Sequence, residues 1–179
     1  AVGCTCNPSY CQKMIDHPKE SGYALAVLDQ VLKEMSDDSA VESLLQRRLA
    51  LPVLEKFLPL YRRDPRRDGF VSLQGDPIRE EDPDVILSEA RANRAVAPNV
   101  CIKIPVTAAG LKAMETLLAE DTAINATEIM SVAQAISLCE LYEEVARQRG
   151  KRPVLFLSHI AGIYDDYLQK YVEREKIDI

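Results

Sequence analysis

A lysine stands in the middle of an apolar segment, "VCIKIPVTAAG" at residues 100–110. Removing an ammonium group from water costs several kcal/mol unless the group is paired or neutral. A partly desolvated lysine has a lowered pKa, and its free amine can attack a carbonyl carbon to form a Schiff base. The alternative is a lysine whose charged end reaches solvent or pairs with a carboxylate. Lys103 is therefore a candidate nucleophile, and this segment alone leaves both interpretations open.

Polar side chains also stand at or just beyond the ends of four other apolar segments. They are Asn7, Ser9, Gln74, Asn125, Thr127 and Ser158. In parallel α/β folds, functional groups gather at the carboxyl ends of strands and in the loops that follow. Asp76 and Glu128 lie close by and are candidate acids, although a surface ion pair is the simpler role for each. The pattern favours a functional site built at strand ends.

The segments that carry these residues are short and mostly apolar, and longer segments of helical period separate them. This alternation is typical of βαβ units in a parallel sheet that is covered on both faces. Five strands are predicted, at residues 2–6, 70–74, 100–105, 123–130 and 154–158. Alternation along the third strand sends Lys103 to the face opposite Ile102 and Ile104.

Helices are predicted between the strands from capping residues and apolar periodicity. Asp82, Thr107 and Ser131 each precede a helical pattern, and a glutamine three residues after Ser131 completes a capping box. The longest connection, residues 21–67, predicts two or three helices, with Pro52 interrupting the second. Five strands fit an open doubly wound sheet, whereas a parallel barrel needs eight strands and typically about 250 residues.

Composition excludes several classes of protein. The 179 residues carry 28 acidic and 22 basic side chains, a net charge of −6, which argues against nucleic acid as a partner. No apolar segment approaches the roughly 20 residues needed to span a bilayer, so no membrane partner is expected and the expected location is the cytoplasm. The five cysteines lack the spacing of a zinc site or a disulfide framework, so neither is expected.

Three motifs in the chain resemble those of the transaldolase family, whose members are class I aldolases with a (β/α)8 TIM barrel. They are "GCTCNPS" at residues 3–9, "IKIPVTAAG" at 102–110 and "INATEIMS" at 124–131. The resemblance implies that the five predicted strands are about the second to sixth of eight. Residues 1–179 would then form one barrel domain that is incomplete at both ends, since missing strands would leave two open sheet edges.

The resemblance also implies roles for individual residues. Lys103 would be the Schiff-base lysine, and Thr127 would help to hold the catalytic water. Gln74 stands where transaldolases usually have a glutamate and the related fructose-6-phosphate aldolases have a glutamine. The implied substrate-binding residues are Asn7, Ser9, Asn125 and Ser158, of which the two asparagines would bind the dihydroxyacetone portion.

The implied activity is a metal- and cofactor-independent transfer of a dihydroxyacetone unit from a ketose or ketose phosphate to an aldose acceptor, in the pentose phosphate pathway. The alternatives are an aldolase that releases free dihydroxyacetone and a catalytically degenerate binding protein. Ile163 stands where the family generally has a phosphate-binding arginine, and His159 where it commonly has proline. The anionic group of the substrate is therefore open between phosphate, sulfonate and none, and a homo-oligomer is compatible with the sequence.

Overall fold

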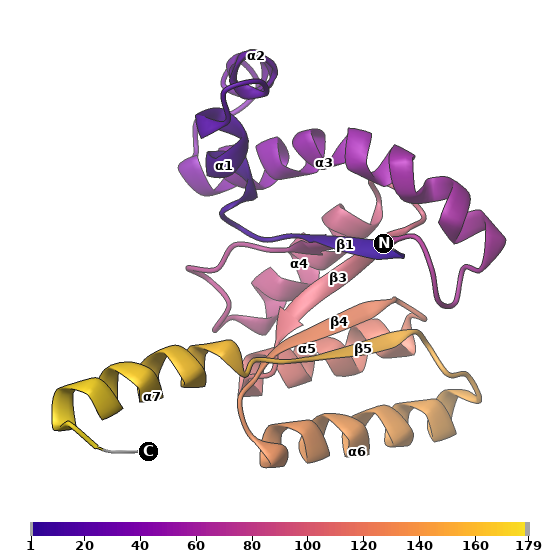
Figure 1. The fold of residues 1–179 in the computed structure, drawn as a ribbon. Helices are drawn as coiled ribbons and strands as arrows, with labels where there is room; N and C mark the ends of the chain where they lie inside the picture. The colour runs from indigo at the N-terminus through magenta and orange to yellow at the C-terminus, as the bar shows by residue number, and fades with distance from the viewer. Residues whose placement is uncertain (1, 178–179) are drawn as a thin grey trace.

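Five parallel strands form one sheet in the computed structural model, which describes residues 2–177 (Figure 1). The strands are β1 (Gly3–Cys6), β2 (Phe70–Gln74), β3 (Val100–Pro105), β4 (Ile124–Ile129) and β5 (Leu155–His159). Each strand begins and ends within one residue of its predicted range. The strands lie side by side in chain order, without the reversal of a doubly wound sheet. The fold is therefore a half-barrel, consistent with a partial TIM barrel, and the doubly wound alternative is wrong.

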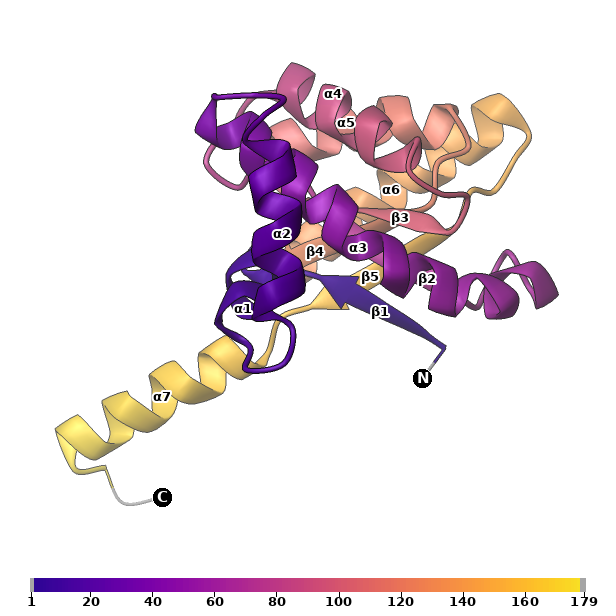
Figure 2. The same ribbon diagram turned by 90° about the horizontal axis from the view of Figure 1, so that it is seen from above.

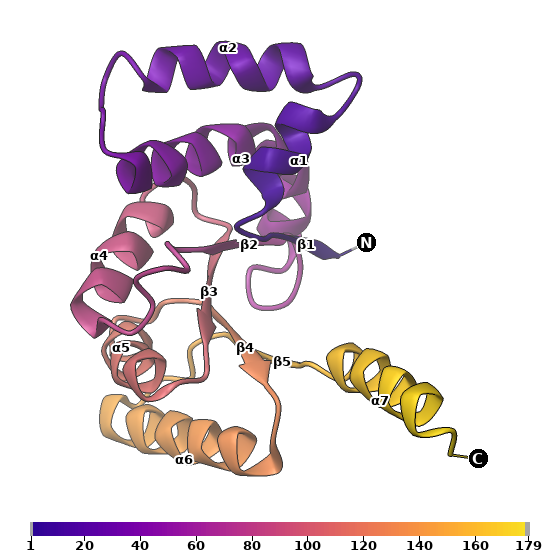
Figure 3. The ribbon, with the colours of Figure 1, turned by 90° about the vertical axis from the view of Figure 1, so that its left-hand side faces the viewer.

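Helices cover the outer face of this half-barrel, as Figure 3 shows. They are α3 (Asp38–Arg63), α4 (Pro83–Arg94), α5 (Ala108–Ala119) and α6 (Val132–Arg149). Buried strand residues such as Leu73, Ile102 and Ile104 belong to the same apolar core as residues of these helices. Because successive strand residues point to opposite faces, Lys103 lies on the inner face of the sheet.

The predicted helix starts after Asp82, Thr107 and Ser131 are confirmed by side-chain capping. Asp82 accepts a hydrogen bond from the N–H of Asp84 at 2.9 Å, and Thr107 accepts one from Gly110 at 3.0 Å. Ser131 accepts from the backbone N–H of the capping-box glutamine at 3.2 Å. Each cap satisfies an N–H group that has no partner within its own helix. These bonds fix where the chain leaves each strand end.

The expectation that Pro52 interrupts a helix is wrong, because α3 runs unbroken through Pro52 and Pro59. A proline inside a helix costs about 3 kcal/mol relative to alanine. Along α3, Leu45 and Leu49 are buried among α1 and α2, and Leu54 is buried in the core of the sheet. Each fully buried leucine contributes roughly 1.5–3 kcal/mol, so packing offsets the cost of the prolines.

The helices α1, α2 and α7 do not belong to this outer layer. α1 (Tyr10–Asp16) and α2 (Ser21–Val31) pack on α3 in a second, smaller apolar cluster. α7 (Gly162–Glu175) leads away from the sheet in Figures 1 and 2 and has no buried residue. Across residues 2–177, none of the helices is both long and apolar enough to cross a membrane.

Candidate active site

Three of the predicted site residues lie in one row across the inner face of the sheet. Gln74 of β2 pairs in register with Lys103 of β3, and Lys103 pairs with Asn125 of β4. Paired residues on neighbouring strands point to the same face, and the strands are about 4.8 Å apart. The register therefore places an amine between two amide side chains.

Lys103 is half-buried and hydrogen-bonded across the sheet. Its Nζ donates to Asn7 Oδ1 at 2.8 Å, which joins β3 to the residue that directly follows β1. Burial lowers the pKa of the Lys103 amine, while the carboxylates of Glu128 and Glu80 oppose this by stabilising the ammonium form. The lowered pKa increases the fraction of free amine, which is the form that attacks carbonyl groups.

Asn125 is the centre of a hydrogen-bonded chain across three strands. Its Nδ2 donates to Ser72 Oγ at 3.2 Å, and its Oδ1 accepts from Ser158 Oγ at 2.7 Å. Asn125 is buried, and these two bonds fix the direction of its amide. The predicted residues Asn125 and Ser158 are thus in direct contact, and Asn125 itself belongs to the row that contains Lys103.

Thr127 and Ser9 lie outside the row formed by Gln74, Lys103 and Asn125. Thr127 is buried on β4, where it pairs in register with Pro105, two residues nearer the carboxyl end than Asn125. Ser9 is exposed at the start of α1, and its side chain makes no capping hydrogen bond. The structure therefore keeps Thr127 on the strand next to Lys103 and places Ser9 at the beginning of a helix.

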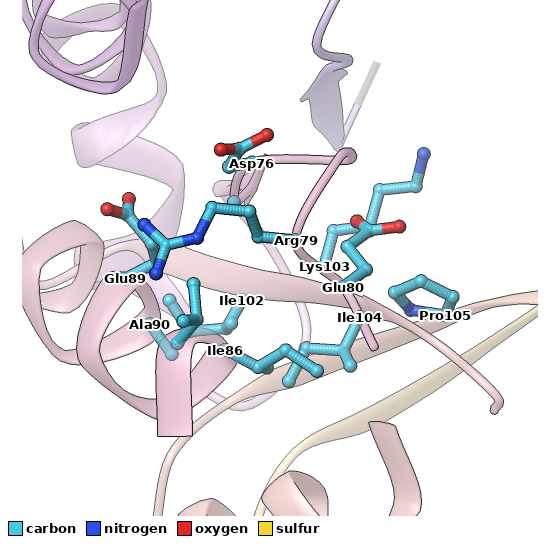
Figure 4. Close-up of a pocket in the computed structure, with 12 residues that line it drawn as sticks. Asp76, Arg79, Glu80, Ile86, Glu89, Ala90, Ile102, Lys103, Ile104 and Pro105 are labelled. Carbon is cyan, nitrogen blue, oxygen red and sulfur yellow. The ribbon is translucent and has the colours of Figure 1, made fainter. Parts of the chain in front are cut away.

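Glu80 was not recognised from the sequence. Its Oε1 accepts a hydrogen bond from Gln74 Nε2 at 2.5 Å, and it lines a pocket together with Lys103 (Figure 4). Burial raises the pKa of the half-buried Glu80 carboxyl, and the bond from Gln74 acts in the opposite direction. The only signal in the sequence is that an acidic loop, "GDPIREED" at residues 75–82, directly follows the polar end of β2.

Asp76 folds this loop instead of forming the expected surface ion pair. It is buried and accepts hydrogen bonds from Ser39 Oγ and, at 2.9 Å, from the N–H of Ile78. Neither Asp76 nor Glu128 takes part in an ion pair within the part of the chain that the structure describes. The ion-pair expectation is therefore wrong for both residues.

Glu128 stands at an irregular point of β4. Its φ is 58°, a left-handed conformation that is unfavourable for residues with a Cβ, and the pairing with β5 shifts next to it. The side chain of Gln134 holds this turn by donating to the carbonyls of Glu128 and Val106 and accepting from the N–H of Met130. Strained backbone of this kind clusters at active sites and ligand-binding sites.

Two departures from the family pattern lie at the end of β5. His159 is exposed at the last position of the strand, and Ile163 is exposed in the first turn of α7. Between residues 2 and 177, the structure gathers no set of three or more metal-ligating side chains in a position to hold a metal ion. The chemistry available at this site comes from an amine, amides, hydroxyls and carboxylates, a set suited to covalent capture of a carbonyl compound.

Comparison with known proteins matches nearly the whole chain to one family. The family model described as "Transaldolase/Fructose-6-phosphate aldolase" matches residues 1–175. A transaldolase from Thermobifida fusca (strain YX) is 32% identical over 190 residues, which cover 98% of this chain and 50% of the relative.

Two further relatives agree with this match. A transaldolase from Helicobacter pylori (strain Shi470) is 29% identical over 82% of the chain and 45% of the relative. "Transaldolase 1" of Streptomyces avermitilis is 32% identical over 79% of the chain and 37% of the relative. The chain spans about half the length, or less, of these curated relatives.

Proposed function

The chain belongs to the transaldolase/fructose-6-phosphate aldolase family, and we propose that it is a Schiff-base transaldolase built around Lys103. In this reaction the Lys103 amine attacks the C2 carbonyl of a ketose or ketose phosphate and forms an iminium. The C4 hydroxyl gives its proton to a general base, the bond between C3 and C4 breaks as its electron pair passes to the iminium, and an aldehyde leaves. The bound three-carbon enamine then attacks an aldose acceptor, and hydrolysis frees the lysine.

The observation that carries this proposal is the setting of Lys103. The amine is half-buried, its pKa is lowered by burial, and it is hydrogen-bonded to Asn7 at 2.8 Å. A lysine that simply reached solvent would need neither the burial nor the amide partner. A nucleophilic amine needs a free lone pair near neutral pH, and lowering the pKa provides it.

The surrounding amides and hydroxyls support binding of a dihydroxyacetone unit. In the proposed complex Asn7 and Asn125 would hydrogen-bond the hydroxyl groups of the unit. Ser158, in contact with Asn125 at 2.7 Å, would bind on the other side, and Ser9 would contribute from the start of α1. Thr127, on the neighbouring strand, would hold the water needed to form and hydrolyse the Schiff base.

A second candidate is an aldolase that releases free dihydroxyacetone. Gln74 favours the aldolase, because the fructose-6-phosphate aldolases have a glutamine where transaldolases usually have a glutamate.

The anionic group of the substrate is a separate question. Ile163 is the reason to test sulfonated and uncharged sugars beside sugar phosphates, because an isoleucine cannot form the paired hydrogen bonds by which arginine binds an anion. A single barrel domain, a cytoplasmic location and a place in the pentose phosphate pathway stay predictions.

The test is to incubate purified full-length protein with candidate ketoses, with and without an acceptor aldehyde, and to measure the new sugar and free dihydroxyacetone. We expect a new sugar that requires the acceptor, and loss of that product in Lys103→Arg, whose guanidinium stays protonated. Lys112→Arg, an exposed lysine on α5, is the matched control and should retain activity. Release of dihydroxyacetone without an acceptor would support the aldolase. Equal product from wild type and Lys103→Arg would refute both.

A further inference from the structure

Glu80 is a half-buried carboxylate that lies close enough to Lys103 for the two charges to interact. It lies in the loop between β2 and α4 and shares the pocket of Figure 4 with Lys103. Gln74, which pairs in register with Lys103, donates its side-chain N–H to Glu80 at 2.5 Å. One hydrogen bond thus links the carboxylate to the row of side chains that contains the amine.

The loop holds Glu80 in place through its own backbone bonds. The N–H of Arg79 donates to the carbonyl of Asp76 at 3.3 Å, and the N–H of Asp82 donates to the carbonyl of Arg79 at 3.2 Å. Asp76 is itself bonded to Ser39 of α3, and Asp82 caps α4. Both ends of the loop are therefore attached to helices, and Glu80 between them has a defined position.

We propose that Glu80 is the general acid and base for Schiff-base chemistry at Lys103, a role that rests on the proposed function above. The amine of Lys103 adds to the ketose carbonyl: the C–N bond forms, and one N–H proton passes to the oxygen. Glu80 in its protonated form then gives its proton to the new hydroxyl group. The C–O bond breaks, water leaves, and the nitrogen lone pair completes the C=N bond.

The products of this step are a positively charged iminium, one water molecule and an ionised Glu80. Hydrolysis runs the same steps in reverse, with the Glu80 carboxylate taking a proton from the attacking water. Gln74 cannot do this itself, because an amide side chain neither gains nor loses a proton near neutral pH. Its part is to orient Glu80, and we expect the pair Gln74–Glu80 to do here what one carboxylate could do alone.

The charges around Glu80 suit both protonation states. Lys103 from β3 stabilises the ionised form, while Asp76 from the same loop and Glu128 from the end of β4 stabilise the protonated form. Arg79 and Glu89 also line the pocket and bring charges of opposite sign. Burial is the largest influence and raises the pKa of Glu80, which keeps a protonated fraction at higher pH than for an exposed glutamate.

The experiment measures exchange of the ketose C2 oxygen with H2¹⁸O, by mass spectrometry, over the background without protein. This exchange needs only formation and hydrolysis of the Schiff base. The variants are Glu80→Gln, which can still accept the bond from Gln74, Glu80→Asp, and Glu81→Gln as a control at the exposed neighbouring position. Exchange is followed from weakly acidic to weakly alkaline pH, and urea midpoints verify folding.

We expect Glu80→Gln to slow exchange roughly 100-fold or more, the contribution typical of a positioned acid or base. It should also lose the fall in rate that deprotonation of Glu80 causes as pH rises. Glu80→Asp should recover part of the rate, and Glu81→Gln should match wild type. A Glu80→Gln protein with the wild-type rate, or slowed with an unchanged pH profile, overturns the Glu80 proposal alone. Absence of exchange and of any reducible adduct in wild type instead overturns the proposed function.

Discussion

Replacing Gly110 with alanine should destabilise the protein and distort the strand that carries Lys103. A Cβ at position 110 would lie 2.0 Å from the carbonyl oxygen of Pro105, the last residue of β3, and 3.3 Å from Cγ2 of Ile104. Carbon and oxygen atoms normally approach no closer than about 3.3 Å, so the start of α5 must move by about 1 Å. The obstructing oxygen belongs to the backbone and cannot rotate away.

The size of the effect follows from two opposing contributions. Overpacking of this kind costs about 1–3 kcal/mol, and the upper end applies because backbone must move. Alanine recovers up to about 1 kcal/mol over glycine inside a helix. We expect a net loss of about 2 kcal/mol in the free energy of unfolding, or a fall in Tm of about 4–8 °C for a chain of this size.

Urea unfolding monitored by circular dichroism measures this loss. Gly22→Ala is the matched control, because Gly22 lies in α2 and a Cβ there meets nothing within 4 Å. That variant should gain up to about 1 kcal/mol. Because Pro105 is two residues beyond Lys103, Gly110→Ala should also reduce adduct formation at the lysine. Wild-type stability in Gly110→Ala would refute the close packing of α5 on β3.

Three other substitutions test the electrostatics and hydrogen bonding of the site and of helix α3. Glu128→Gln removes a carboxylate that raises the pKa of Lys103, so the pH dependence of borohydride-trapped adduct should move to lower pH. Glu42 has a pKa raised by burial and by Asp76, so the folded state binds more protons and stability falls as pH rises above the ordinary glutamate range. Glu42→Gln should therefore become more stable relative to wild type between pH 4 and pH 7 in urea titrations. Ser158→Ala removes the bond to Asn125 and should cost about 1 kcal/mol in the same titration.

A specific result would contradict each of these three predictions. A trapping profile that stays in place or moves to higher pH in Glu128→Gln would mean that its carboxylate does not act on Lys103. For Glu42, Glu55→Gln at an exposed position of α3 is the control, and equal behaviour of the two variants would contradict the assignment to burial. An unchanged urea midpoint in Ser158→Ala would show that the bond to Asn125 contributes no net stability.

The strands and helix starts could be predicted because their signals are local. Short apolar segments rich in β-branched residues marked the strands, and Asp82, Thr107 and Ser131 provide caps within a few residues of the groups they bind. The continuity of α3 through Pro52 could not be predicted, because it depends on burial against the sheet and against two other helices. The helices α1 and α7 were also not predicted from the sequence.

Part of the candidate site was predictable for a topological reason. Lys103 and Asn7 are 96 residues apart, and they meet because parallel strands bring their carboxyl ends to one edge of the sheet. Glu80 was missed because its position depends on how a loop folds. The loop conformation depends on the hydrogen bond between Asp76 and Ser39, which lies 37 residues earlier in the chain. The sequence around Asp76 does not predict this contact.

The most direct test of the central claim is to locate the covalent adduct. Full-length protein is incubated with a ketose, reduced with borohydride and digested, and the peptides are sequenced by mass spectrometry. We expect a sugar-derived mass on Lys103 that is absent from Lys103→Arg and from the exposed Lys112 of wild type. No adduct with any ketose in a folded protein, or equal modification of Lys103 and Lys112, would contradict the proposal that Lys103 is the Schiff-base nucleophile.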